Sequence, residues 1–302
     1  MIVFNSPSFG GVLKLMGRGA GKVMFPAIVA VLFFVAAGCA SLPKLLDASD
    51  TGDAGSVEKL LKKGEDPDMD YKGFRPIIMA SANGHTDVVR LLVDKGADVN
   101  ARIGRKGMEG ITALMMASRN GHEDIVKILL SKGAEVDALG HSGESALIEA
   151  VKNGHTEIVT MLLAGGADEG TADFSGESAL FKASALGHSE MVRMLLNRGA
   201  DTEKKENSEG LTALMMASGR GHVEIVMMLL ERGADPMAKA YDGTTALYLA
   251  ASGGDAETVR ILLQKGADPN ARRSDGSTPL ERAKWDKNEE IAGILRSFGA
   301  TD

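Results

Sequence analysis

The sequence predicts an all-α solenoid of about eight helix-turn-helix units joined by short β-hairpin-like turns. Three features predict it: a recurring alanine, a glycine four residues after most of these alanines, and a Gly-Ala pair that closes most units. A period near 33 residues indicates small stacked units, none of which buries its apolar face alone. The recurring alanines are Ala48, Ala80, Ala117, Ala150, Ala183, Ala217, Ala250 and Ala283.

The first helix of each unit is expected to begin five residues before the alanine, where most units have Thr or Ser. Such a residue caps a helix N-terminus, and the following position is Ala or Pro, which suits the first helical turn. A glycine then ends the helix in the left-handed conformation at little steric cost. The expected caps are Thr112, Ser145, Ser178, Thr212, Thr245 and Thr278, and the glycines are Gly84, Gly121, Gly154, Gly187, Gly221 and Gly254.

A second helix follows in each unit, with its apolar pattern clearest in residues 125–130 and 225–230. It is expected to end at the Gly-Ala pair, after which polar, glycine-containing residues lead to the next cap. Each unit is therefore predicted as helix, tight turn, helix and long polar turn.

Together these motifs resemble the ankyrin repeat, with its T-P-L-H-x-A start, G-H turn and G-A-D-x-N end, over roughly residues 43–300. The first unit has Pro43 in place of the hydroxyl cap, the second has Arg75, and the last has Lys287 in place of glycine. Irregular terminal units are common in repeat stacks, since each end faces water. The resemblance implies a concave binding surface formed by the long turns and first helices.

We expect three segments: a leader 1–38, a spacer 39–42 and the repeat array 43–302. The units span about 43–70, 71–101, 108–138, 141–171, 174–204, 208–238, 241–271 and 274–302.

The leader has the features of a bacterial lipoprotein signal peptide. An uncharged, mostly apolar run, Val23 to Ala37, follows three basic residues and is too short for a typical membrane span. It leads into Ala-Ala-Gly-Cys, which resembles a lipobox and predicts lipidation of Cys39. The resemblance implies an outer-membrane lipoprotein facing the periplasm. The alternatives are a signal peptide cut elsewhere or an uncleaved anchor, and Met16 is an alternative start.

Composition favours a protein partner over nucleic acid. The chain has 34 basic and 41 acidic residues, a net charge of −7, and the leader contributes basic residues but no acid. An acidic array repels nucleic acid and anionic lipid. Aromatic residues are only 4% of the chain, which leaves few stacking platforms for bases.

The residue types that could carry chemistry are better explained by structure. Five histidines follow turn glycines about one repeat apart, too far for one metal ion, and we expect them to bind backbone groups in the turns. The 16 methionines are one indication of copper binding, because thioethers bind Cu(I). They mostly occupy helix positions where other units have Ile, Leu or Phe, so core packing explains them better. No catalytic set is evident, so we expect no enzyme activity, cofactor or small-molecule substrate.

The candidate partner-binding residues lie at turn tips and at the ends of first helices. Aromatic and Arg side chains at such places are typical interface anchors, although turn aromatics can instead fold onto the neighbouring turn. The longest repeat step reveals a basic insertion at residues 102–109, either a functional loop or a solvated spacer. The candidates are Tyr71, Phe74, Arg102, Arg105, Lys106, Arg119, Lys152, Phe174, Leu186, Arg220, Tyr241 and Trp285.

Two further expectations follow. Glu149 and Lys182 occupy equivalent positions 33 residues apart, which predicts an ion pair between adjacent first helices. For function, the sequence favours a lipid-anchored protein-interaction module of the cell envelope. The alternatives are an immunity protein that neutralises a periplasmic toxin, an envelope scaffold without a dedicated partner, and an enzyme whose site the motifs do not reveal.

Overall fold

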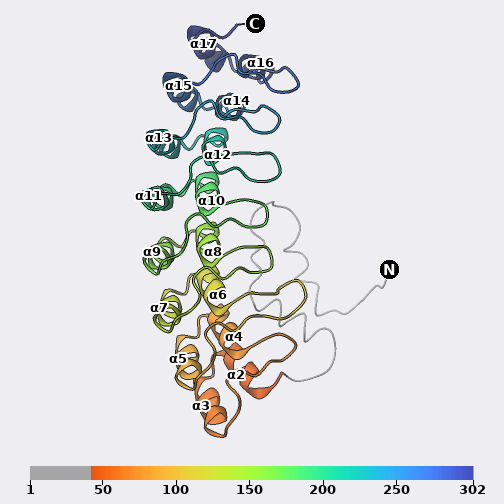
Figure 1. Cartoon of the computed structure of the whole chain (residues 1–302), viewed down its shortest axis with the longest axis vertical. Helices are drawn as coiled ribbons and strands as arrows, with labels where there is room; N and C mark the ends of the chain where they lie inside the picture. Colours follow the sequence, from red (N-terminus) through yellow and green to blue (C-terminus); the bar gives the residue numbers. More distant parts are fainter. Residues whose placement is uncertain (1–41, 302) are drawn as a thin grey trace, which may run out of the picture. The chain divides into compact units, whose positions relative to one another are not determined.

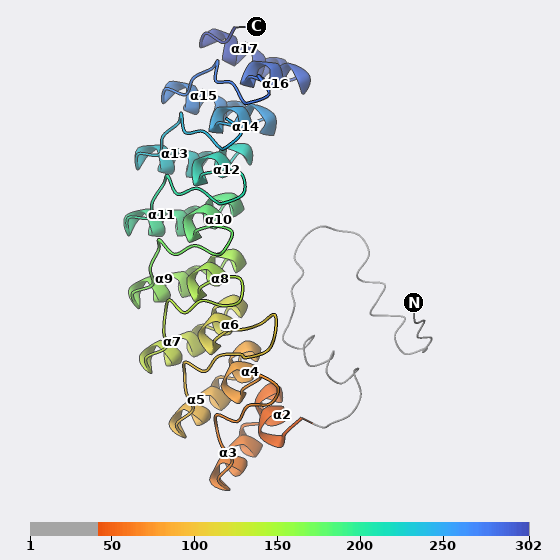
Figure 2. The same cartoon turned by 45° about the vertical axis from the view of Figure 1, so that its right-hand side comes forward.

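The computed structural model describes residues 42–301, which form two columns of stacked helices (Figure 1). The leader 1–38 and Cys39 lie outside the described residues. Within residues 42–301, no helix is both long enough and apolar enough to span a bilayer. Each unit contributes one helix to each column (Figure 2), and the long turns project from the inner column, as Figure 1 shows.

The predicted helix-turn-helix repeat is confirmed. The inner column comprises α2 (Lys44–Thr51), α4 (Pro76–Asn83), α6 (Ala113–Asn120), α8 (Ala146–Asn153), α10 (Ala179–Leu186), α12 (Ala213–Gly219), α14 (Ala246–Gly253) and α16 (Pro279–Trp285). The outer column comprises α3 (Ala54–Lys62), α5 (Thr86–Asp94), α7 (Glu123–Ser131), α9 (Thr156–Ala164), α11 (Ser189–Asn197), α13 (Val223–Glu231), α15 (Ala256–Gln264) and α17 (Glu289–Ser297). Isolated antiparallel bridges such as Ala172 with Ser178 give three long turns their hairpin-like character.

The predicted hydroxyl caps begin the inner helices of the last six units. In α6, for example, the Thr112 hydroxyl accepts a hydrogen bond from the Met115 amide, and Thr278 forms a complete capping box with Glu281. Pro43 and Arg75 provide no side-chain cap, as expected from the sequence. In the last unit, Lys287 adopts a positive φ of 56° at the position where the other units have glycine.

The core lies between the two columns and between successive units. The leucine two residues after each cap, such as Leu114 or Leu147, is almost fully buried, as are Ile125 and Val126 on the outer helix α7. Each unit therefore completes its core only against its neighbours, which is the energetic reason for the stack.

The turn histidines link neighbouring units. Nε2 of His122 donates to the Ala82 carbonyl at 3.1 Å, and Nε2 of His155 donates to the Arg119 carbonyl at 3.1 Å. Both acceptors lie on the inner helix of the preceding unit, whereas the sequence suggested acceptors within the turn. The glycine of that preceding unit leaves room for the ring, because a Cβ built on Gly121 would lie 2.6 Å from Cε1 of His155.

A second set of inter-unit hydrogen bonds follows the Gly-Ala pairs. In five units, a side-chain oxygen accepts from a backbone amide of the next unit; for Asn100 and the Glu135 amide the distance is 2.7 Å. The other acceptors are Asp68, Asp137, Glu203 and Asn270. Gly170 and Met237 occupy the same position in two units and have no side-chain oxygen to offer.

Two packing expectations need correction. The predicted ion pair between Glu149 and Lys182 is wrong. A carboxylate oxygen of Glu149 lies 4.0 Å from Nε of Arg119, while Lys182 binds Asp173 and Glu177 of its own long turn. Equivalent helix positions bring two residues into register, but each side chain turns to a nearer partner. Core packing is confirmed for methionines such as Met115, whereas Met227 and Met237 are exposed.

Candidate functional site

The long turns of the last five units are joined by a ladder of backbone hydrogen bonds. Each tip amide donates to a carbonyl of the preceding turn at 2.7–3.0 Å. This turn ladder consists of Phe174 to Ser142, Asn207 to Ser175, Tyr241 to Glu209, and Ser274 to Asp242. The tips therefore form a connected surface, and their side chains are presented from fixed backbone.

Phe174 and Tyr241 are the exposed aromatic residues of this ladder, with 69% and 66% of their surface accessible. Each ring has one edge against the glycine of the preceding turn: a Cβ built on Gly143 would lie 2.5 Å from Phe174, and one on Gly210 would lie 2.7 Å from Tyr241. Both predicted interpretations are therefore partly right. The rings fold onto the neighbouring turn, and most of their surface remains open to a partner.

Side chains near the ends of the inner helices lie on the same surface as the long turns. Lys152 of α8 shows this, because its ammonium binds Glu144 in the long turn of its own unit. Trp285 occupies the equivalent position at the end of α16 and is 82% exposed, and Leu186 at the end of α10 is also exposed. We call the long turns and the inner-helix residues beside them the turn face.

The insertion is folded onto the turn before it. Ile103 is buried, and its amide and carbonyl bond Ile111 and Gly110 at 2.9 Å. The guanidinium of Arg105 lies 5.3 Å from the centre of the Phe74 ring. Phe74 is consequently only 7% exposed, so the expectation of an exposed aromatic at this position is wrong.

The other candidate cations differ in how far they are already engaged. Arg102 is exposed but pairs with Glu135 at 2.6 Å, and Arg220 donates to the Ala185 carbonyl. Arg105 and Lys106 are exposed on the insertion, and Tyr71 is half-buried. The turn face therefore presents a few accessible cations among engaged ones.

The middle of the turn face holds partly buried ionic contacts. Burial raises the pKa of Glu149, and the nearby Glu144 carboxylate raises it further. Burial also acts to raise the pKa of Glu144, but Lys152 and Ser142 outweigh it and leave that pKa lowered. For Lys182, burial disfavours the charged form, yet Glu177 and Asp173 outweigh it and raise the pKa. These contacts hold the side chains of Glu144, Glu149, Lys152 and Lys182 in place.

Glu206 organises the long turn of the sixth unit, which contains one residue more than those of its neighbours. Its carboxylate accepts from the amides of Ser208, Glu209 and Leu211 at 2.7–3.1 Å, and from the Ser208 hydroxyl at 2.6 Å. Burial acts to raise the pKa of Glu206, but these four hydrogen bonds outweigh it and lower the pKa to about 2.

Arg273 fastens the last two long turns to each other. Its guanidinium bonds Asp242 at 2.5 Å, Asp275 at 3.0 Å and the Thr244 hydroxyl at 2.8 Å, and it lies over the Tyr248 ring. The hydrogen bond from Arg273 is the main cause that lowers the pKa of Asp242 to about 2. Asp242 and Asp275 are thereby paired with a cation of the protein itself.

Among residues 42–301, no cluster of three or more His, Cys, Asp and Glu side chains could hold a metal ion. What the fold does present is an extended surface of linked turns with exposed aromatic and cationic side chains. Such an arrangement defines a repeat scaffold for binding other macromolecules.

The family comparison agrees with this class. The family model for ankyrin repeats matches residues 45–103, 99–173, 147–240 and 237–301. The chain therefore belongs to the ankyrin repeat family, whose members typically bind protein partners and are typically non-catalytic. No curated protein shows significant similarity to the chain.

Proposed function

We propose that this chain is a non-catalytic protein-interaction module of the bacterial cell envelope, which binds a protein partner on its turn face. The observation that supports this most directly is the pair of exposed rings, Phe174 and Tyr241, on turns that backbone hydrogen bonds hold in place. Rigid, exposed aromatic side chains lose little conformational entropy on binding and commonly dominate interface energies.

The proposal is tested by affinity capture from an envelope extract with the array as bait. We expect a protein that the native array retains and the Phe174→Ser/Tyr241→Ser variant does not. The matched control is Met227→Ser/Phe298→Ser, which removes two exposed apolar side chains outside the turn face. Two results would contradict the proposal. The native array and the turn-face variant retain the same proteins, or no protein is specifically retained. Arg105→Glu/Lys106→Glu tests the insertion in the same way.

Anchoring through a lipid on Cys39 is the second part of the proposal. It rests on the apolar leader and the Ala-Ala-Gly-Cys sequence that precedes the array. We expect the native chain in the membrane fraction of a Gram-negative host and the Cys39→Ser variant to lose lipid labelling. Unchanged labelling with a radioactive fatty acid in the variant would contradict lipidation at this residue.

An immunity protein that neutralises a periplasmic toxin is a narrower form of the same proposal. A toxin gene beside the gene for this chain would favour it. A scaffold without a dedicated partner is the outcome if capture yields no specifically retained protein.

A further inference from the structure

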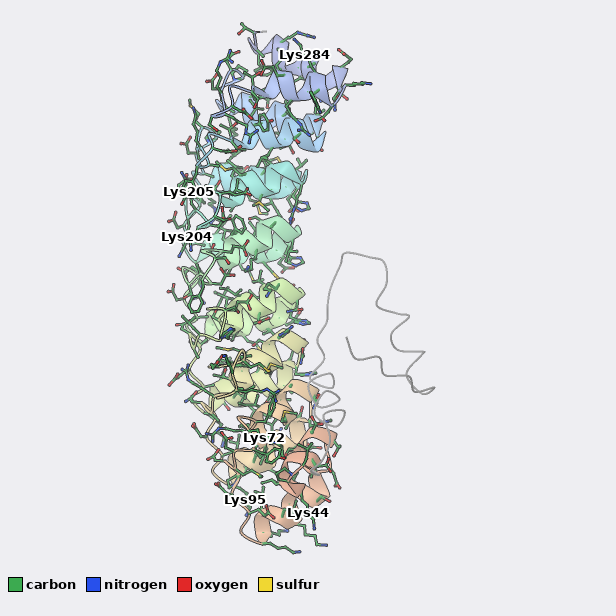
Figure 3. The ribbon with its side chains drawn as sticks, turned by 90° about the vertical axis from the view of Figure 1, so that its right-hand side faces the viewer. Lys44, Lys72, Lys95, Lys204, Lys205 and Lys284 are labelled. Atoms are coloured by element: carbon green, nitrogen blue, oxygen red, sulfur yellow. The ribbon has the colours of Figure 1, made fainter. Side chains whose placement is uncertain are left out.

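Three successive long turns carry a cation at the same position. Lys239 and Arg272 stand 11 residues before the recurring alanine of their units, and Lys205 stands one residue further from its alanine, in the turn that has the extra residue. All three side chains are exposed. Figure 3 shows Lys205 among the turns, at the edge away from the inner helices.

None of these three cations has a carboxylate partner within salt-bridge distance among residues 42–301. The Lys205 ammonium donates to the Lys239 carbonyl at 2.7 Å, and the Arg272 guanidinium donates to the Gly276 carbonyl at 2.9 Å. These contacts fix two of the charges without neutralising them. By contrast, Arg102 pairs with Glu135, although it also stands six residues after the glycine of the preceding Gly-Ala pair, as these three cations do.

Except for the exposed Glu209, the acids of the same turns pair with Arg273 or accept hydrogen bonds within the turns. Asp242 and Asp275 both bind Arg273, and the Glu206 carboxylate accepts four hydrogen bonds from its own turn. Lys205, Lys239 and Arg272 therefore form a row of exposed cations without carboxylate partners, on a chain whose net charge is −7. An anionic ligand would relieve the mutual repulsion of these charges.

The spacing of the row sets the form of that ligand. Neighbouring helices in contact lie about 10 Å apart, so the same turn position recurs at about that distance. A polypeptide in the extended polyproline II conformation advances about 3.1 Å per residue with three residues per turn, so every third side chain faces the same side and recurs at about 9 Å. The turn ladder, with bonds of 2.8 Å and 2.7 Å at Tyr241 and Ser274, holds the three turns in line.

We propose that this row binds an extended acidic segment of a partner protein, with a carboxylate at every third residue. The segment runs along the turn ladder, and the exposed Tyr241 ring beside Lys239 contacts the residues between its carboxylates. This inference rests on the proposed function and specifies the chemistry of the partner that the turn face accepts.

The test uses two synthetic peptides of about ten residues and identical composition, measured by fluorescence anisotropy at low salt. One peptide has three aspartates at every third position, and the other has them adjacent. We expect the spaced peptide to bind the native array more tightly, and Lys205→Gln/Lys239→Gln/Arg272→Gln to weaken its binding about tenfold. Lys239→Gln alone, which removes no hydrogen bond shown by the structure, should weaken it about twofold to threefold.

The matched control is Lys59→Gln/Lys63→Gln/Lys265→Gln, which removes the same charge from exposed positions outside the turn face. It should bind the spaced peptide as the native array does. Equal affinity for the two peptides, native-like binding by the row variant, or row-dependent binding of phosphatidylglycerol vesicles without peptide binding would each overturn the inference. If the capture experiment yields a turn-face partner and the spaced peptide does not bind, this inference fails while the proposed function stands.

Discussion

Gly121→Ala is expected to destabilise the array by about 2–3 kcal/mol. Gly121 has a φ of 81°, a left-handed conformation that costs an alanine about 1–2 kcal/mol. The added Cβ would also lie 2.6 Å from the His155 ring. The ring must then move and weaken its hydrogen bond to the Arg119 carbonyl, a loss of about 0.5–1.5 kcal/mol. Urea unfolding followed by circular dichroism measures the change.

Gly154→Ala is the matched control for this effect. Gly154 has nearly the same φ, 78°, but its added Cβ would lie 3.7 Å from the nearest atom of His188. We expect it to cost only about 1 kcal/mol, from the backbone alone. Gly121→Ala/His155→Ala should cost less than the two single changes together, because the clash disappears. Equal costs for Gly121→Ala and Gly154→Ala would contradict a packing role for the histidine ring.

Glu206→Gln is expected to lower the free energy of unfolding by about 2 kcal/mol at pH 7. The folded-state pKa of about 2 lies below the ordinary value of 4.5, so the carboxylate stabilises the fold above about pH 4.5. This contribution is lost as the pH falls from about 4.5 towards 2. The difference in stability between the native chain and the variant should therefore be largest near neutral pH and shrink towards pH 3.

Thermal or urea unfolding of both proteins between pH 7 and pH 3 measures this difference. Glu209→Gln is the control. It removes an exposed carboxylate from the same turn but keeps the Glu206 carboxylate, which accepts the hydrogen bonds of the turn amides. Hydrogen exchange should show the loss of protection concentrated at the amides of Ser208, Glu209 and Leu211, since each unit of a stack contacts only its neighbours. A stability difference that stays constant down to pH 3 contradicts the assigned role.

The fold was predictable because each unit repeats the same local signals. Cap residues such as Thr112 and left-handed glycines such as Gly121 act within a few residues of their position, so their pattern predicts helix starts and ends directly. The exposure of Leu186 and Trp285 followed from the same register, whereas for Phe174 and Tyr241 the register left both exposure and folding onto the neighbouring turn open. Their role in binding stays a prediction.

Features that depend on how turns pack against each other were not predictable from register alone. Phe74 was expected to be exposed, but the insertion covers it. The sequence shows the length of the insertion and does not show where it folds. Glu149 and Lys182 were paired by position, but each has a nearer partner. The role of Glu206 had a signal in the sequence, the 34-residue step between Ala183 and Ala217, which marks one extra residue in that turn.

The central claim is that the turn face holds the partner. The most direct measurement is hydrogen exchange of the array with and without the protein that it retains in the capture experiment. We predict slowed exchange in the long turns around Phe174, Tyr241 and Arg272, with the outer helices unchanged. Slowed exchange confined to the outer helices would contradict the claim.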